Sequence, residues 1–162
     1  MVKAILAVEK NSGMGYNGTL PWPKNSEDLK HFKNKTVGCT VVMGSGTWND
    51  KCFPSPLKDR DNFVISSKGF ENYKGANVLS KNIPEFIQYI DSRNMMTDTW
   101  IIGGKNVLEQ LHDIIDEYHI TTINGEYECD VFFDLPMNDF VKASSTISTS
   151  NGNEYSVFKR IR

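Results

Sequence analysis

The sequence predicts an α/β fold, with a mainly parallel central sheet flanked by helices and an antiparallel hairpin at the C-terminus. Short apolar runs, which suit strands covered on both faces, alternate with segments of helical period along most of the chain. Near the C-terminus the pattern becomes strand-only, with Asn-Gly turns between the strands. The length of 162 residues is that of one ordinary domain, so we expect a single domain over residues 1–162.

The expected elements follow from local patterns along the chain. Apolar or β-branched runs predict strands at Val2–Glu9, Thr40–Met43, Asn62–Ile65 and Thr99–Ile102. Apolar residues at helical spacing predict helices at Ser26–Lys35, Ile83–Ser92 and Asn106–Ile115. The remaining strands are predicted at Glu117–Ile123, Asp139–Ser148 and Glu154–Arg160, and the Asn-Gly-Asn turn at 151–153 joins the last two into the hairpin.

Composition and charge exclude several classes of protein. Hydrophobic residues make up 39% of the chain and charged residues 23%, a balance typical of globular rather than disordered proteins. The net charge of −2 provides no positive field for nucleic acid or anionic lipid, and no apolar run is long enough to span a bilayer. We therefore expect a soluble, cytoplasmic protein with no nucleic-acid or membrane partner. We also expect a monomer.

The cysteines and histidines indicate neither disulfides nor a metal. The cysteines are odd in number and widely spaced, which predicts three unpaired thiols in a reducing compartment: Cys39, Cys52 and Cys129. The histidines show no tight ligand spacing, so we expect no metal site: His31, His112 and His119.

A glycine-rich loop follows the first predicted strand. Residues 13–18 satisfy the pattern G-x-G-x-x-G, but Pro21 and Pro23 exclude the helix that a dinucleotide-binding turn requires at this point. The segment is better described as a glycine loop that ends in a rigid Pro-Trp-Pro. A plain surface loop and a mobile lid over a pocket both fit these residues.

Two neighbouring acids begin the first predicted helix. Ser26 is the predicted N-cap, and the helix dipole alone would explain Glu27 and Asp28 in the first turn. Helical phase places Asp28 beside an inward arc and Glu27 roughly opposite; the arc is formed by Leu29, Phe32 and Thr36. Asp28 is therefore the acid that can reach an apolar pocket, where desolvation would raise its pKa toward a range useful for proton transfer.

Small residues follow two of the predicted parallel strands. One strand runs into Gly103-Gly104, and the other into Gly44-Ser45-Gly46-Thr47. Glycine lets the backbone approach a ligand closely, and the N–H groups at a helix start can hold phosphate, although tight strand-to-helix turns would look the same. Because the carboxyl ends of parallel strands share one edge, the pair predicts a nucleotide across that edge.

Together these motifs resemble dihydrofolate reductase over nearly the whole chain. In order they are Ile5-Leu6-Ala7-Val8, Gly-x-Gly-x-Asn-Gly-x-Leu-Pro-Trp-Pro at 13–23, Asp28-Leu29-x-x-Phe32-Lys33, Val42-Met43-Gly44-x-x-Thr47-Trp48, Pro56-Leu57-x-x-Arg60-x-Asn62, Ser66-Ser67, Ile101-Ile102-Gly103-Gly104 and Asp130-x-x-Phe133. The resemblance implies a single dihydrofolate reductase-like domain that reduces 7,8-dihydrofolate to 5,6,7,8-tetrahydrofolate with NADPH. It also implies a role in one-carbon metabolism and thymidylate synthesis.

The resemblance further implies the site residues. Asp28 would support protonation of pterin N5 through a water near Trp22, and Leu20 would close the glycine lid as a third catalytic position. Arg60 would grip the substrate's glutamate carboxylate, and the full substrate set is Ile5, Leu6, Asp28, Leu29, Phe32, Leu57, Arg60, Ile102 and Thr121. The cofactor set is Ala7, Met14, Gly15, Leu20, Gly44, Ser45, Gly46, Thr47, Ser66, Ser67, Lys68, Ile102, Gly103, Gly104, Lys105, Asn106, Val107 and Leu108.

Some positions depart from the family's usual pattern. Ser45 and Gly46 stand where a basic residue commonly meets the 2′-phosphate of NADPH, and Lys68 and Lys105 are the candidate replacements. Asp59 replaces a frequent glycine, and Leu108 replaces a common aromatic.

Two other functions stay open at this stage. One is a reductase of the same fold that acts on another pterin or on a ribosylamino-pyrimidine. The other is a folate- or nucleotide-binding protein without catalysis. Arg60 and the Asp28 helix argue against the first alternative, and the acid together with the paired glycines argues against the second.

Overall fold

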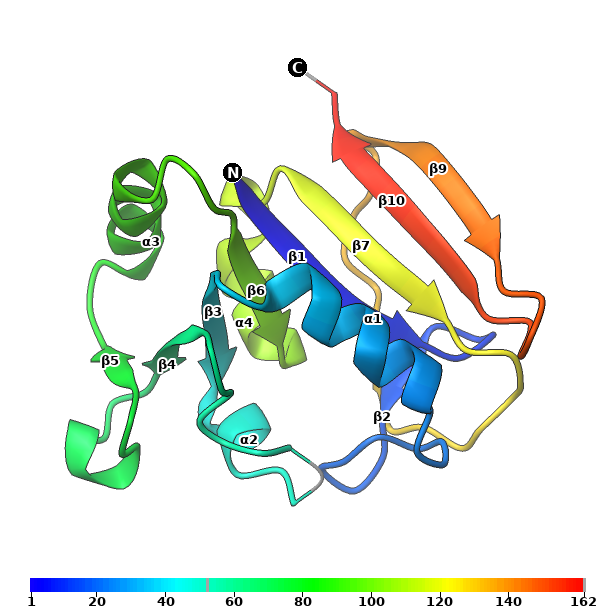
Figure 1. Cartoon of the computed structure of the whole chain (residues 1–162), viewed down its shortest axis with the longest axis horizontal. Coiled ribbons are helices and arrows are strands. Elements are labelled where there is room, and N and C mark those ends of the chain that lie inside the picture. The colour runs from blue at the N-terminus through cyan, green and yellow to red at the C-terminus, as the bar shows by residue number, and fades with distance from the viewer. Residues whose placement is uncertain (52, 162) are drawn as a thin grey trace.

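An eight-stranded sheet forms the centre of the computed structural model, which describes residues 1–51 and 53–161. The strand order is β5-β4-β3-β6-β1-β7-β10-β9 (Figure 1). All neighbours from β5 to β7 are parallel, whereas β10 pairs antiparallel with both β7 and β9. This arrangement confirms the predicted fold class. The strands are β1 Val2–Val8, β3 Thr40–Gly44, β4 Asp61–Ile65, β5 Asn77–Leu79, β6 Thr99–Gly103, β7 Glu117–Thr122, β9 Phe140–Ile147 and β10 Glu154–Arg160.

Helices cover both faces of the parallel part of the sheet. On one face lie α1 (Ser26–Thr36) and α2 (Ser45–Trp48), and Phe32 and Trp48 pack there against a core cluster that includes Val41 and Trp100. On the other face lie α3 (Ile83–Arg93) and α4 (Lys105–Leu111), which contribute to the larger core cluster. Figure 1 shows α1 crossing in front of the sheet and α4 behind it. The 3₁₀ turns are η1 Phe70–Asn72 and η2 His112–Ile114.

Burial explains why the strand signals were clear. Residues Val41, Val42 and Met43 of β3 are fully buried, because helices or loops cover both faces of a central parallel strand. In β9, by contrast, every residue after Phe140 is exposed, as suits a polar strand at the edge of a sheet. Strand β9 therefore forms an exposed edge of the sheet.

Two expectations about helix ends are wrong. The N-cap of α1 is Asn25, whose side-chain oxygen accepts a hydrogen bond from the Asp28 N–H at 3.0 Å, and Ser26 is already helical. The predicted helix 106–115 ends at Leu111, where η2 begins. Asn25 and Ser26 are both suitable N-cap residues, so the local sequence does not decide which of the two caps α1.

The shortest elements were missed. The glycine loop contains β2 (Gly13–Gly15), which pairs with β8 (Val131–Phe132) as a separate two-stranded sheet. The strand β5, the helix α2 and the turn η1 were also not predicted. Segments of two to four residues carry too few positions to show a period of their own, so they depend on long-range pairing.

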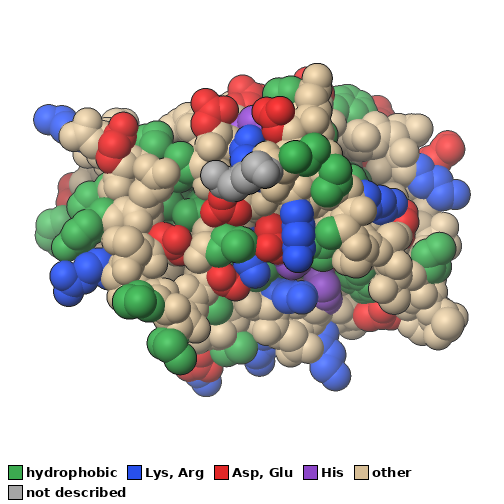
Figure 2. Space-filling view, turned by 90° about the horizontal axis from the view of Figure 1, so that it is seen from above, with side chains coloured by type: hydrophobic (Ala, Val, Ile, Leu, Met, Phe, Trp, Pro, Cys, Tyr) green, Lys and Arg blue, Asp and Glu red, His purple; other side chains and the backbone are tan. Residues whose placement is uncertain are grey.

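The described surface carries mixed charge. Figure 2 shows acidic and basic side chains interspersed over one face of the molecule. Within residues 1–51 and 53–161, none of the helices combines the length and the apolar character that a membrane span requires. The same residues contain no group of three or more His, Cys, Asp or Glu side chains arranged to hold a metal ion. Cys39 and Cys129 are free, and the predicted free thiol at Cys52 lies outside the described residues.

Candidate active site

Asp28 lies in the first turn of α1 and faces strand β7. Its carboxylate accepts a hydrogen bond from the hydroxyl of Thr121, a buried residue of β7. Burial raises the pKa of Asp28, the neighbouring charge of Glu27 raises it further, and the Thr121 hydrogen bond opposes both. The carboxyl group therefore keeps its proton to a higher pH than an exposed aspartate, as a group that relays protons requires.

Glu27 faces a different part of the molecule. Its carboxylate accepts hydrogen bonds from Ser148 at 3.0 Å, from Tyr155 at 3.1 Å and from Ser150. The hydroxyls of Ser150 and Ser148 are the main reason that the pKa of Glu27 lies below its usual value. Helical phase had separated Glu27 from the arc beside Asp28, and in the structure the two acids bond to different partners: Asp28 to Thr121 of β7, and Glu27 to Tyr155 of β10 and to two serines.

Four of the predicted apolar substrate residues come together from four segments of the chain. Ile5 and Leu57 are buried in the core cluster on the α1 face, and Phe32 and Ile102 pack against that cluster. The structure does not bring Leu6 to them, because Leu6 packs against the cluster on the opposite face of the sheet. Alternation along a strand makes this unavoidable for neighbours such as Ile5 and Leu6.

Two other predicted apolar positions are open to solvent. Leu29 was expected on the inward arc, but its side chain is 41% exposed, whereas Thr36 on the same arc is buried. Leu20 at the end of the glycine loop is 44% exposed. Both side chains are at the protein surface.

Arg60 lies beside the C-terminal end of α1. Its Nη1 donates to the Thr36 hydroxyl at 3.0 Å, its Nε donates to the Lys58 carbonyl at 2.8 Å, and its guanidinium lies 5.9 Å from the ring centre of Phe32. Burial lowers the pKa of Arg60, which nevertheless stays charged at neutral pH. No carboxylate forms an ion pair with Arg60 among the described residues. The guanidinium is thus oriented while part of its donor fork remains free for an acidic ligand.

Asn62 organises the turn that presents Arg60. This buried side chain accepts from the Leu57 N–H at 2.9 Å and donates to the carbonyls of Leu57 at 2.9 Å and Arg60 at 3.0 Å. Asn62 was recognised as part of a motif but was given no role. The available signal was an amide residue directly after a turn, where such side chains often bond to nearby backbone.

The carboxyl ends of β3 and β6 meet, as the paired glycine motifs predicted. A Cβ atom on Gly44 would lie 3.0 Å from Cγ2 of Val107 and 4.0 Å from the Gly103 carbonyl oxygen, so Gly44 permits close approach of these segments. Gly103 adopts φ +117°, and its peptide bond to Gly104 is cis. Neither α2 nor α4 has a side-chain cap at its N-terminus, and both begin at this edge. Their first N–H groups are thus available for an anionic ligand.

The predicted cofactor residues of α4 differ in what they can offer. The side chains of Val107 and Leu108 are buried in the core, and both N–H groups bond to the Gly104 carbonyl at 3.1 Å. Residues Lys105 and Asn106 are nearer the surface. Lys105 forms an ion pair with Asp134 at 3.0 Å, whereas Lys68 has no ion pair among the described residues. Of the two candidate replacements for the missing basic residue, Lys68 is therefore the one whose positive charge is not paired with an acidic side chain of the described residues.

Two acids fix the base of the glycine loop. The buried Glu9 carboxylate accepts from the backbone N–H groups of Asn11 at 2.7 Å and Gly13 at 2.8 Å. The Asp130 carboxylate accepts from the Asn17 N–H at 3.0 Å, beside the β2–β8 pair. Neither acid was predicted to have this role. An acid followed by Asn and Gly is a local sign of such side-chain-to-backbone bonding, but the Asp130 contact spans 113 residues of chain and has no local sign.

Comparisons with known proteins give one consistent result. A family model described as Dihydrofolate reductase matches residues 1–161. The dihydrofolate reductase of Bos taurus is 33% identical over 156 residues, which cover 87% of this chain and 81% of that protein. The dihydrofolate reductase of Gallus gallus is 34% identical over 155 residues, which cover 86% and 81%.

A solved structure gives the same result in three dimensions. Dihydrofolate reductase from Enterococcus faecalis, complexed with NADP(H) and RAB-propyl, superimposes with a TM-score of 0.83 and 28% identity, over 99% of this chain and 96% of that one. The resemblance carried by the motifs is thereby confirmed, and the chain belongs to the dihydrofolate reductase family.

Proposed function

We propose that this chain reduces 7,8-dihydrofolate to 5,6,7,8-tetrahydrofolate with NADPH, and that Asp28 supports protonation of pterin N5. The observation that carries the proposal is the Asp28 carboxyl group, held by Thr121 with a raised pKa, in a chain that matches the family over residues 1–161. The product would supply one-carbon metabolism and thymidylate synthesis.

The substrate's two polar ends match two charged side chains of the site. The Asp28 carboxylate would accept hydrogen bonds from the 2-amino and ring N–H groups of the pterin. Ile5, Phe32 and Leu57 form apolar surface on the same side of the sheet. Arg60, oriented by Thr36 and Phe32, would bind the carboxylate of the glutamate tail. A substrate with an acidic tail would therefore be favoured over a neutral pyrimidine.

The protein's chemical contribution is orientation and one proton. NADPH, when bound, supplies the hydride. Asp28 would hold the proton that N5 receives and pass it through a water near Trp22, since proton transfer needs a group protonated near the working pH. Trp22 is buried, with its ring centre 6.4 Å from that of Tyr127, which gives the region a fixed wall. Leu20, at the end of the glycine loop, would help to exclude bulk water.

The residues at the carboxyl edge of β3 and β6 fit a dinucleotide. Gly44, Gly103 and Gly104 permit close backbone approach, and the uncapped starts of α2 and α4 offer N–H groups to phosphates. Lys68 follows Ser66, whose hydroxyl accepts from the Lys68 N–H at 3.1 Å and contacts the Tyr73 hydroxyl at 2.8 Å. We expect Lys68, rather than Lys105, to meet the 2′-phosphate.

The test is the loss of reduced-nicotinamide absorbance when the protein meets dihydrofolate, with NADPH and NADH assayed in parallel. Rapid oxidation of NADPH with little of NADH is the expected result. Lys68→Gln should then raise the KM for NADPH about tenfold, the effect of one charge-assisted contact, and leave that for NADH unchanged. Lys105→Gln is the matched control. No oxidation of either cofactor would contradict the proposed function, and equal effects of the two lysine variants would contradict the assignment of Lys68.

A further inference from the structure

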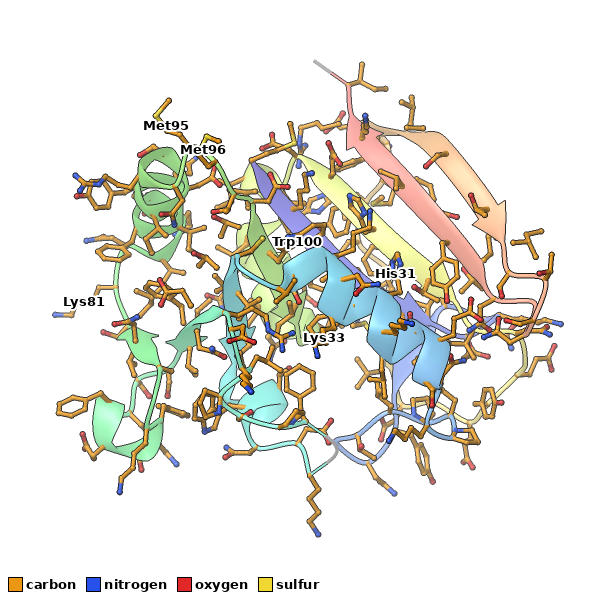
Figure 3. All side chains as sticks on the ribbon, in the orientation of Figure 1. His31, Lys33, Lys81, Met95, Met96 and Trp100 are labelled. Atoms are coloured by element: carbon orange, nitrogen blue, oxygen red, sulfur yellow. The ribbon has the colours of Figure 1, made fainter. Side chains whose placement is uncertain are left out.

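A cavity of about 180 Å³ lies beside α1, and one of its lining residues, Tyr155 of β10, pairs with Thr121, the β7 residue that bonds to Asp28. Its side chains come from α1, β7, β9 and β10, and those used below are His31, Lys35, His119, Ser144, Thr146 and Tyr155. The cavity shares no residue with the proposed substrate and cofactor sites. In Figure 3, His31 lies on the part of α1 that is in front of β7, and its ring centre is 4.5 Å from that of Tyr155.

The lining side chains are basic or hydroxylic. His31 and Lys35 come from successive turns of α1, His119 comes from β7, and the hydroxyls of Ser144 and Thr146 come from β9. No carboxylate is among the lining residues. Within the described part of the chain, Lys35 has no ion pair. The lining therefore combines the charge of Lys35 with hydroxyl groups and two histidine rings that can gain a proton, and it contains no carboxylate.

The neighbouring carboxylates Glu117 and Glu27 bond to side chains that line the cavity, and the charge of Asp28 also acts on Tyr155. Glu117 lies 3.1 Å from Nε2 of His119 and 3.8 Å from the Lys3 ammonium. Glu27 accepts from Tyr155 at 3.1 Å and from two serines of the turn between β9 and β10. The contact with Glu117 occupies Nε2 of His119, so Nδ1 becomes a second donor only when the ring is protonated.

We propose that this cavity binds a phosphate group. The donors approach from a helix and from two strands, so they suit a tetrahedral oxyanion, whose oxygens diverge, better than a planar carboxylate. Inorganic phosphate and a small phosphomonoester share this chemistry. The site is independent of the reductase reaction, because its residues have no part in the proposed mechanism.

Protonation of the histidines accompanies binding. Burial is the main cause that lowers the pKa of both His31 and His119, and the charge of Lys35 lowers both further. Glu27 acts in the opposite direction on His31, Glu117 does so on His119, and Lys3 adds to the lowering at His119. A bound phosphate stabilises the protonated rings, so it raises both pKa values, and phosphate binds more tightly as the pH falls.

The test is an NMR titration of the histidine ring protons, with the protein saturated in NADPH so that the dinucleotide site is filled. Added inorganic phosphate, or glycerol phosphate in a second series, should move the titration midpoints of His31 and His119 to higher pH. His112, whose Nδ1 lies 2.6 Å from the Tyr118 hydroxyl outside the cavity, is the internal control and should not move. Shifts in either series support the site, and the tighter ligand identifies the source of the phosphate.

A pair of lysine variants separates a built site from general surface charge. Lys35→Gln should weaken phosphate binding at least about tenfold, because one charged donor is lost. Lys33→Gln removes the same charge from an exposed position on the same helix, which does not line the cavity, and should leave binding unchanged. Unshifted histidines, shifts equal to those of His112, or equal weakening in both variants would each overturn the proposal. Well-dispersed spectra of both variants verify folding.

Discussion

Two neighbouring sides of α1 each begin with an acid, but the two acids lie in different surroundings. The inner side, formed by Asp28, Phe32 and Thr36, faces β7 and Arg60. The outer side begins with Glu27, continues with residues 31 and 35, and faces the hairpin of β9 and β10 together with His119 of β7. Residues 28, 32 and 36 form one row along the helix, and residues 27, 31 and 35 form the next. Residues that are neighbours in sequence therefore lie in two different environments.

The difference shows that surroundings, rather than residue type, decide what an acid can do. Glu27 receives three hydroxyl donors and its pKa falls. Asp28 receives one hydroxyl donor, from Thr121, which does not offset burial, and its pKa rises. A carboxylate surrounded by donors stabilises the fold, whereas a carboxyl group with few donors is available to a ligand.

The largest expected effect is on catalysis. Asp28→Asn should lower kcat/KM for dihydrofolate about 10²- to 10⁴-fold at neutral pH, because the amide can neither hold nor relay the proton. Glu27→Gln, next to it, should leave kcat/KM close to that of the parent chain. Steady-state assays of both variants check the pair. The reverse ranking would assign the catalytic acid to the outer side of the helix.

The second effect is on substrate affinity at the other end of the inner side. Arg60→Gln should raise the KM for dihydrofolate about 10- to 100-fold, because a charge-assisted contact to the glutamate carboxylate is lost. The KM for NADPH should not change, and Arg60→Lys should recover only part of the loss because an ammonium lacks the planar fork. If the two KM values rise together, Arg60 acts through the fold and not through the tail.

Much of this division could be predicted from the sequence. The buried strands, the phase of α1 and the contrast between the two acids all depend on local periodicity, which residues such as Val41 and Phe32 report directly. The edge formed by Gly44 and Gly103 followed from a general property of parallel strands. The strands, the helix phase and the contrast between the acids are determined by neighbours along the chain, whereas the edge follows from a rule that holds for any parallel sheet.

The features that were missed depend on distant partners. Asp130 meets the glycine loop across 113 residues, and Glu27 meets Ser148 across 121. The position of Leu6 was misjudged because the motif was transferred as a block, although alternation along β1 sends its side chain to the other face. A single sequence contains no signal for the two long-range contacts, whereas the alternation along β1 was a local signal for the position of Leu6.

The third prediction concerns the pH dependence of the reaction. If protonated Asp28 is the active form, turnover falls as the pH rises through its pKa. Thr121→Val removes the hydrogen bond that lowers this pKa, so the fall should move to higher pH. The pH dependence of kcat/KM measures this shift. Ser144→Ala, on the outer side, is the control and should leave the profile unchanged. A profile that moves to lower pH would show that Thr121 does not stabilise the charged carboxylate.

The smallest effects are on stability, and the two acids should differ in sign. The lowered pKa of Glu27 means that the carboxylate stabilises the fold above its unfolded pKa of about 4.3, and that this contribution is lost as the pH falls through the folded value. Glu27→Gln should therefore lower Tm at neutral pH and have little effect in acid. The raised pKa of Asp28 means that ionisation opposes folding.

Asp28→Asn should accordingly raise Tm at neutral pH, and its advantage should vanish below the unfolded Asp pKa of about 3.9. Thermal unfolding of both variants across this pH range tests the two signs together. Asp28→Asn would then make the chain more stable and less active. The reason is that Asp28 has few hydrogen-bond donors within the protein, which leaves its carboxylate available to the ligand but lowers the stability of the fold. Equal changes in Tm for the two variants would mean that the two sides of α1 do not differ in the way their acids are solvated.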